Sequence, residues 1–259
     1  MKHGTILSNE PLKSGYFMVR FYAPEVCKNA RAGQFAHVRI EEHSQQILRR
    51  PFSIHEATAD GTLTIVYKVV GAGTERLSQL KAGDHCDIMG PLGNAYTAPE
   101  ADEIPILVAG GYGSAAMYML TGESKTPGIA LLGARSEGDV ILADRYEKAG
   151  FEVQISTNDG SLGHPGFVTE LIDPLQERFA GKKLRFYGCG PHPMLMALVK
   201  LMRQRACQGE VSLDHLMCCG IGACFACVVK VNADNEQGWK YSRSCKEGPV
   251  FNADEVYCP

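Results

Sequence analysis

The cysteine pattern near the C-terminus constrains this chain more than any other feature. Cys219, Cys224 and Cys227 are separated by four and then two residues, and Cys245 follows at a distance. This spacing is typical of plant-type [2Fe–2S] clusters, in which one tight loop supplies three thiolates and a later segment the fourth. Gly220 allows the sharp backbone turn that such a loop needs. We therefore predict a [2Fe–2S] cluster held by Cys219, Cys224, Cys227 and Cys245.

Other interpretations of the cysteines stay open at this point. Cys218 is an alternative to Cys219 as the first ligand, although only Cys219 leaves four residues before Cys224. A structural zinc site usually contains two Cys-x2-Cys units, whereas only Cys224 and Cys227 have that spacing here. Free thiols in a cysteine-rich core are a further alternative.

Composition restricts the class of protein. The chain has 259 residues, a formal net charge of −3 and ten cysteines. It has no basic excess that indicates nucleic-acid binding. No run approaches the roughly 18 apolar residues of a membrane span, and residues 1–15 contain no apolar run typical of a signal peptide. Ten cysteines without an export signal argue against a disulfide framework. We expect a soluble redox protein in a reducing cytoplasm.

Residues 1–99 are predicted to form a small antiparallel β-barrel. Apolar and polar residues alternate over 17–21 and 36–40, and residues 62–70 and 85–89 are further strand candidates with Gly and Asp turns between them. Several short strands at this spacing favour a barrel.

Two segments of this barrel carry chemical groups. Arg50, Phe52 and Ser53 place a guanidinium, a ring and a hydroxyl on one extended segment, suited to a phosphate and a heterocycle. Gly73 and Thr74 precede a helical stretch, where Thr74 is expected to act as the N-cap of an anion-binding helix start. Each segment alone is also compatible with an ordinary strand edge or turn.

Residues 100–206 are predicted to form a doubly wound parallel sheet. Strand and helix patterns alternate, and this arrangement places a ligand at the carboxyl ends of the strands. The strand candidates are 104–109, 129–132, 151–156 and 184–187, and the helix candidates are 115–120, 141–148, 168–179 and 193–205. The loops 110–114, 188–194 and 156–160 follow three of these strands. Residues 207–259 then form a small cluster lobe.

The order of these motifs resembles the ferredoxin–NADP reductase superfamily. The Arg-x-aromatic-Ser and Gly-x-x-Ser/Thr motifs, followed by Cys-Gly-Pro-x-Pro-Met at residues 189–194, carry the resemblance. It implies FAD, with Arg50 facing the phosphates and Ser53 the isoalloxazine ring. The implied FAD residues are Arg50, Pro51, Phe52, Ser53, Tyr67, Lys68, Val69, Gly73 and Thr74.

The same resemblance implies a nicotinamide dinucleotide, NAD(H) or NADP(H). Its pyrophosphate turn contains Gly110, Gly111 and Gly113, and Arg135 lies where relatives contact the adenosine end. Cys189 is implied near the hydride path, with a buried strand-end thiol as the alternative. Tyr112 departs from the usual Gly-Gly-Gly-Ile-Gly turn and puts the nucleotide's identity in question.

The cluster and tail motifs are similar to the electron-transfer subunits of type B dihydroorotate dehydrogenases. Met-x-Cys-Gly-Ile-Gly-Ala-Cys-x-x-Cys and Ser-Cys-Lys-Glu-Gly-Pro-Val-Phe-x-Ala-x-Glu-Val carry this resemblance. It implies an FMN-containing catalytic partner, two copies of each subunit, and electron flow from dihydroorotate through FMN, the [2Fe–2S] cluster and FAD to NAD+. Alternatives are a diaphorase subunit of a bifurcating NADPH–ferredoxin oxidoreductase, sulfhydrogenase or sulfite reductase, and a non-enzymatic redox sensor or zinc-stabilised binding module.

Overall fold

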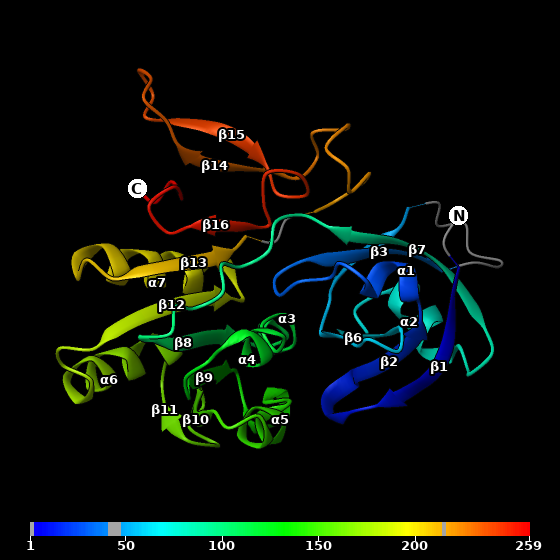
Figure 1. The fold of residues 1–259 in the computed structure, drawn as a ribbon, viewed down its shortest axis with the longest axis horizontal. Helices are drawn as coiled ribbons and strands as arrows, with labels where there is room; N and C mark the ends of the chain where they lie inside the picture. Colours follow the sequence, from blue (N-terminus) through cyan, green and yellow to red (C-terminus); the bar gives the residue numbers. More distant parts are fainter. Residues whose placement is uncertain (1–2, 41–47, 214–215) are drawn as a thin grey trace.

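The computed structural model describes residues 3–40, 48–213 and 216–259. They form two seven-stranded sheets and one two-stranded hairpin (Figure 1). The strands are β1 His3–Pro11, β2 Tyr16–Tyr22, β3 Phe35–Ile40, β4 Arg50–Ser53, β5 Glu56–Ala57, β6 Thr62–Lys68, β7 His85–Leu92, β8 Glu103–Gly110, β9 Ile129–Ala134, β10 Glu152–Thr157, β11 His164–Pro165, β12 Lys183–Cys189, β13 Gln208–Ser212, β14 Val228–Asn232, β15 Trp239–Arg243 and β16 Val250–Asn252.

The helices are short. They are α1 Pro24–Cys27, α2 Ala72–Gln79, α3 Gly113–Ala116, α4 Leu120–Glu123, α5 Ala143–Lys148, α6 Ile172–Arg178 and α7 His192–Gln204, with 3-10 turns η1 Lys13–Gly15, η2 Glu137–Asp139 and η3 Val168–Leu171. Within the described residues, none of them has both the length and the apolar character needed to cross a bilayer.

The first sheet is antiparallel, in the order β4-β3-β7-β1-β2-β6-β5, and we call it the flavin barrel after the cofactor that the sequence resemblance implies. Its inner face is closed by buried apolar side chains such as Val19, Val38 and Ile65. Alternation produces this face, because residues two apart on a strand point to the same side. The barrel expected from residues 1–99 is confirmed. β1 was not predicted, since its polar sequence shows no clear alternation.

The second sheet, in the order β11-β10-β9-β8-β12-β13-β16, is parallel except for β16. We call this sheet with its helices the α/β domain. Helices α6 and α7 contribute to the core on one face, and α3, α4 and α5 to the core on the other. The chain builds outward from β8 through β9 and β10, then returns to place β12 on the other side of β8. The doubly wound fold is confirmed, and its switch point lies between β8 and β12.

Two strands of the C-terminal segment belong to this second sheet. β13 pairs with β12, and β16 pairs with β13, although both strands lie within the predicted cluster lobe 207–259. The boundary expected after residue 206 therefore does not separate two sheets, because Val211 and Phe251 belong to the α/β core. What projects from the sheet is the loop 216–227 and the β14–β15 hairpin (Figure 1).

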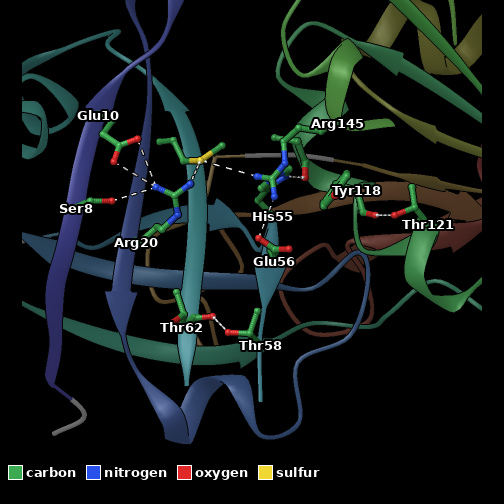
Figure 2. Close-up of polar contacts among 12 residues, drawn as sticks. Ser8, Glu10, Arg20, His55, Glu56, Thr58, Thr62, Tyr118, Thr121 and Arg145 are labelled. Atoms are coloured by element: carbon green, nitrogen blue, oxygen red, sulfur yellow. Dashed lines mark hydrogen bonds and ion pairs between the residues drawn. The ribbon is translucent and has the colours of Figure 1, made fainter. Parts of the chain in front are cut away.

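A group of polar side chains joins the flavin barrel to the α/β domain (Figure 2). The His55 ring is fully buried, donates from Nδ1 to the Ala115 carbonyl at 3.0 Å and accepts from Arg145 at Nε2 at 2.9 Å. Arg145 also donates to Glu56 at 3.1 Å. Both His55 and Arg145 stack on the Tyr118 ring, with centroid distances of 4.6 Å. These contacts fix the two domains against each other.

The buried His55 ring predicts that the free energy of unfolding depends on pH. Burial lowers the pKa of His55 to about 3, and the charges of Arg145 and Arg20 act in the same direction, against the Ala115 carbonyl. Between that value and about 6.5, the unfolded chain binds a proton that the folded chain excludes. The free energy of unfolding should therefore decrease as pH falls below about 6.5, by about 2 kcal/mol at pH 5.

Chemical denaturation at pH 7 and pH 5 checks this, with His55→Gln beside the wild type at equal cofactor loading. The variant should lose about 2 kcal/mol less than the wild type over this interval. Identical pH dependence in the two proteins would contradict the assignment.

Candidate functional site

A pocket of about 500 Å³ lies where the flavin barrel, the α/β domain and the loop 216–227 meet. The barrel supplies most of its wall, and each of the other two parts supplies apolar side chains. The lining residues are Phe35, Arg50, Pro51, Phe52, Ser53, Val66, Tyr67, Lys68, Val70, Thr74, Tyr112, Ala115, Leu216, Met217 and Pro249. Most of the residues predicted to bind FAD are therefore brought together around one cavity.

The Arg50 side chain lies against the start of α2. A Cβ atom at Gly73 would lie 2.4 Å from Arg50 Nε, so the absence of a side chain at Gly73 leaves room for the guanidinium. Arg50 also donates to the Leu48 carbonyl. The guanidinium and the positive end of α2 thus form one electropositive corner of the pocket, which suits a phosphate.

Thr74 does not act as the N-cap of α2, which corrects the sequence-based expectation. Gly71 is the N-cap, and Thr74 is the third helical residue. Its Oγ1 accepts from the backbone N–H of Val70 at 2.9 Å and of Gly71 at 3.2 Å, and donates to the Gly71 carbonyl at 2.9 Å. Thr74 therefore bonds the backbone of the N-cap residue from the third helical position, which is the role of that position in a capping box.

The end of β6 supplies a further part of the wall. The Tyr67 hydroxyl donates to Asn9 at 3.1 Å and its ring stacks on Phe17, and burial raises the pKa of Tyr67. Lys68 bonds Asp139 of the α/β domain at 2.6 Å. Val69, also predicted at the FAD site, packs instead against the core of the flavin barrel.

The nucleotide-side glycines lie at the switch point of the second sheet. Gly110 ends β8, Gly111 has a φ of +55°, and Gly113 begins α3. A Cβ atom at Gly113 would lie 2.1 Å from the Cys189 carbonyl oxygen, so the turn and the end of β12 cross closely. Tyr112 is half-exposed and lines the pocket.

Two further predicted residues lie outside the pocket wall. Cys189 is completely buried at the end of β12, in the core that includes Leu107 and Ala109. The Arg135 side chain follows β9, is 80% exposed and forms an ion pair with Asp139 at 3.4 Å. Their predicted roles toward the nucleotide stay predictions.

The four predicted cysteine ligands form two pairs. Cys219 lies beside the Cys224 thiol, and the Cys245 backbone N–H donates to Cys227 Sγ at 3.4 Å. No three His, Cys, Asp or Glu side chains of the described residues converge as they would around a single ion. Two thiolates per iron is the arrangement that a binuclear cluster needs, so the paired geometry fits a [2Fe–2S] group.

Backbone N–H groups surround these sulfurs. Burial raises the pKa of Cys219, but the N–H of Ile221, the Cys224 thiol and two further N–H groups outweigh it and lower the pKa to about 6. Gly222 N–H donates to Cys245 Sγ at 3.2 Å. Burial, together with Cys227, raises the pKa of Cys245 to about 12. The donors that face the Cys219 sulfur favour Cys219 as the first ligand.

The segments that carry the cysteines are fastened to the end of the barrel and to β15. The Asn94 backbone N–H donates to the Gly248 carbonyl at 2.6 Å, which ties the end of the barrel to the segment after Cys245. Arg243 donates to the Gly222 carbonyl at 2.8 Å and forms an ion pair with Glu247.

Sequence reasoning missed part of the site. Phe35, Met217, Cys227 and Cys245 share one small apolar core, and His37 lies beside it. The alternation in residues 35–40 contains a usable signal, because it places 35 and 37 on the face opposite the barrel core.

Comparisons with known proteins agree with this geometry. Residues 13–96 match the model of the oxidoreductase FAD-binding domain, and residues 214–257 match the iron–sulfur cluster binding domain of dihydroorotate dehydrogenase B. The chain therefore has an FAD-binding domain and an iron–sulfur-binding domain, as predicted.

Similar proteins cover nearly the whole chain. The dihydroorotate dehydrogenase B (NAD(+)) electron transfer subunit of Desulforamulus reducens is 39% identical over 93% of this chain and 92% of its own length. That of Fusobacterium nucleatum is 39% identical over 86% of each chain. Among solved structures, one of an NADH-dependent reduced ferredoxin-NADP oxidoreductase superposes with a TM-score of 0.84 at 30% identity, covering 98% of this chain and 90% of that chain.

A ferredoxin reductase of carbazole 1,9a-dioxygenase has a TM-score of 0.66 at 20% identity, covers 80% of this chain and 66% of its own, and shows the shared fold alone. The identity to the curated relatives, sustained over most of both chains, decides the family. This chain belongs to the electron transfer subunits of dihydroorotate dehydrogenase B, within the ferredoxin reductase-like oxidoreductases.

Proposed function

We propose that this chain passes electrons between an FMN-containing dihydroorotate dehydrogenase subunit and NAD+ in the cytoplasm, in a complex with two copies of each subunit. The observation that carries the proposal is the pocket wall itself, since residues of the flavin barrel, Tyr112 of the α/β domain and Met217 beside the cysteines meet there. A flavin exchanges electrons in pairs with a nicotinamide and singly with an iron–sulfur cluster, which is the chemistry this pocket has to accommodate.

We assign the binding of each cofactor to particular residues of the chain. Arg50 and the start of α2 hold the FAD phosphates, and Ser53 and Thr74 face the pocket beside them. Cys219, Cys224, Cys227 and Cys245 would hold the iron–sulfur cluster, which would supply one-electron transfer when bound. The loop 110–114 and the end of β12 receive the nicotinamide dinucleotide at the switch point. The apolar lining from Phe35, Met217 and Pro249 excludes water between the flavin and the cysteine loop.

Exposed apolar side chains around the cysteine loop support docking of the partner there. Ile221 is 54% exposed and Phe225 62% exposed. An exposed aromatic residue of this kind is a common anchor of protein–protein interfaces.

The ligand assignment predicts different outcomes for neighbouring cysteines. Cys224→Ser should abolish the cluster's visible and EPR signals because one iron loses a thiolate, whereas Cys218→Ser should retain both signals and the iron content. Iron and sulfide analysis of anaerobically purified protein measures this. Cluster loss in Cys218→Ser with retention in Cys219→Ser would move the first ligand by one residue.

The flavin assignment predicts a specific effect at Gly73. Gly73→Ala should displace the Arg50 guanidinium and weaken FAD binding about tenfold, or by about 1.4 kcal/mol, through loss of a charge-assisted contact. Fluorescence titration of FAD into apoprotein measures the affinity. Gly71→Ala is the matched control, since Gly71 has an extended backbone and nothing lies within 4 Å of its Cβ position. Equal effects of the two substitutions would contradict the assignment.

The proposed docking surface contains Phe225 as an exposed aromatic anchor. We therefore expect Phe225→Asn to weaken the association of this chain with its catalytic partner about tenfold or more. Asparagine tolerates the positive φ of Phe225, and Phe167→Asn, at a side chain 64% exposed on the α/β domain, is the control. We would measure the association of each variant with a purified FMN-containing dihydroorotate dehydrogenase subunit. The mixture would then be assayed for dihydroorotate-dependent NAD+ reduction. A catalytic partner that reduces NAD+ at full rate without this chain would exclude the proposed role.

A second candidate function has one observation in its favour. The similarity to the NADH-dependent reduced ferredoxin-NADP oxidoreductase extends over 98% of this chain. NADH would also reduce a diaphorase subunit of such a complex, but that subunit would exchange electrons with ferredoxin and NADP(H) rather than with a dihydroorotate dehydrogenase subunit. Co-purification from the native host distinguishes the two.

A further inference from the structure

The carboxylate of Asp139 is shared by two cations from different parts of the molecule. Its Oδ1 accepts from Lys68 Nζ of the flavin barrel at 2.6 Å, and its Oδ2 pairs with Arg135 of the α/β domain at 3.4 Å. The Asp139 side chain is 14% exposed and that of Lys68 25%, whereas that of Arg135 is 80% exposed. One carboxylate therefore bridges a shielded cation of the flavin barrel and an open cation of the α/β domain.

This bridge lies at the switch point of the second sheet. Gly110 at the end of β8 pairs with Gly133 of β9, and the Gly111 N–H donates to the Gly133 carbonyl at 2.9 Å. Arg135 follows β9 directly, so it leaves the sheet at the strand end next to the glycine turn. Open α/β sheets bind their ligands at this edge.

Lys68 approaches the same turn from the flavin barrel. Its Nζ lies 4.6 Å from the centre of the Tyr16 ring, and a Cβ atom at Gly111 would lie 3.7 Å from the Tyr16 hydroxyl oxygen. A further barrel cation, Lys13, donates to the carbonyl of Glu137 at 3.0 Å, in the 3-10 turn η2 that ends at the bridging carboxylate. Cations of both domains thus gather beside the turn that we assign to the dinucleotide.

The bridging carboxylate is ionised. The hydrogen bond from Lys68, together with the charges of Lys68 and Arg135, outweighs burial and holds the pKa of Asp139 below its usual range. Lysine and arginine side chains that meet around one anion are typical ligands of a phosphate. Asp139 therefore supplies, from within the chain, a negative charge at a place where a phosphate of a bound dinucleotide would also be stabilised.

We propose that Asp139 occupies a phosphate subsite formed by Lys68 and Arg135, and that it competes with the nicotinamide dinucleotide for these two cations. The inference deepens the proposed function and rests on the dinucleotide site assigned there. A phosphate that enters between the two side chains has to replace the carboxylate and is repelled by its charge, since like charges placed together in a binding site cost affinity. Asp139 thus sets how tightly the chain holds its nucleotide.

The test measures equilibrium binding rather than turnover. Asp139→Asn removes the charge but keeps the size of the side chain and an oxygen that can accept from Lys68. NAD+ and NADP+ are titrated by calorimetry into the oxidised, cofactor-loaded chain, where no electron is transferred because both components are oxidised. We expect the variant to bind NAD+ about fivefold more tightly than the wild type at low salt, with a smaller gain at high salt because salt screens the charges.

The two nucleotides distinguish the phosphate that enters the subsite. An equal gain for NAD+ and NADP+ would assign the diphosphate that they share, and a gain for NADP+ alone would assign its additional ribose phosphate. In either case, Arg135→Gln should weaken binding more in the Asp139→Asn background than in the wild type, because the arginine then has no competing carboxylate.

Asp102→Asn is the matched control, because Asp102 pairs with Lys183 at the amino ends of β8 and β12, the opposite edge of the same sheet. It changes the net charge equally and should leave both affinities unchanged. Affinity in Asp139→Asn that equals or falls below that of the wild type, or an equal gain in Asp102→Asn, would overturn the competition. Failure of the wild type and of every variant to bind either nucleotide would reject the dinucleotide site of the proposed function, and the inference with it.

Discussion

The arrangement of the site depends on β3, which is shared by two kinds of contact. Its edge forms the ladder with β4, so the backbone of Arg50–Ser53 is placed by hydrogen bonds to β3. Its outer face carries Phe35 against Cys227 and Cys245. Because alternate residues of a strand point to opposite faces, this one short strand contributes to the barrel core, pairs with the Arg50–Ser53 segment and supports the cysteine loop. A change in the register of β3 would move all three together.

Contacts between the two domains hold the turn around Tyr112, the part of the site that the α/β domain supplies, close to the flavin barrel. His55, Arg145 and Tyr118 form one seam, and Lys68 with Asp139 forms another close to the pocket. Ion pairs at exposed sites contribute little, but here Lys68 and Asp139 are mostly shielded and His55 is fully buried. The two seams keep the turn around Tyr112 beside the residues of the flavin barrel, so that both domains line one cavity.

Much of this was predictable because it is encoded locally. Cysteine spacing indicated the iron–sulfur site, the alternation of strand and helix indicated the doubly wound sheet, and the segment around Arg50 does line a pocket. The misses are long-range. His55 and Arg145 are far apart in sequence and leave no periodic signal, and the capping by Gly71 in place of Thr74 depends on how the turn closes. The membership of β13 and β16 in the second sheet has no local signal, because the two strands pair across the whole intervening cysteine segment.

That membership bears on how such a chain is assembled. Ser212 at the end of β13 is paired with Val250 at the start of β16, so the segment that carries the cysteines leaves the sheet and returns to it at adjacent positions. Neighbouring strands are about 4.8 Å apart, a gap that a short turn can span. The iron–sulfur segment is therefore an insertion between two strands of a sheet that is otherwise continuous. A reductase frame can gain or lose a one-electron centre at this point while its own strand order is preserved.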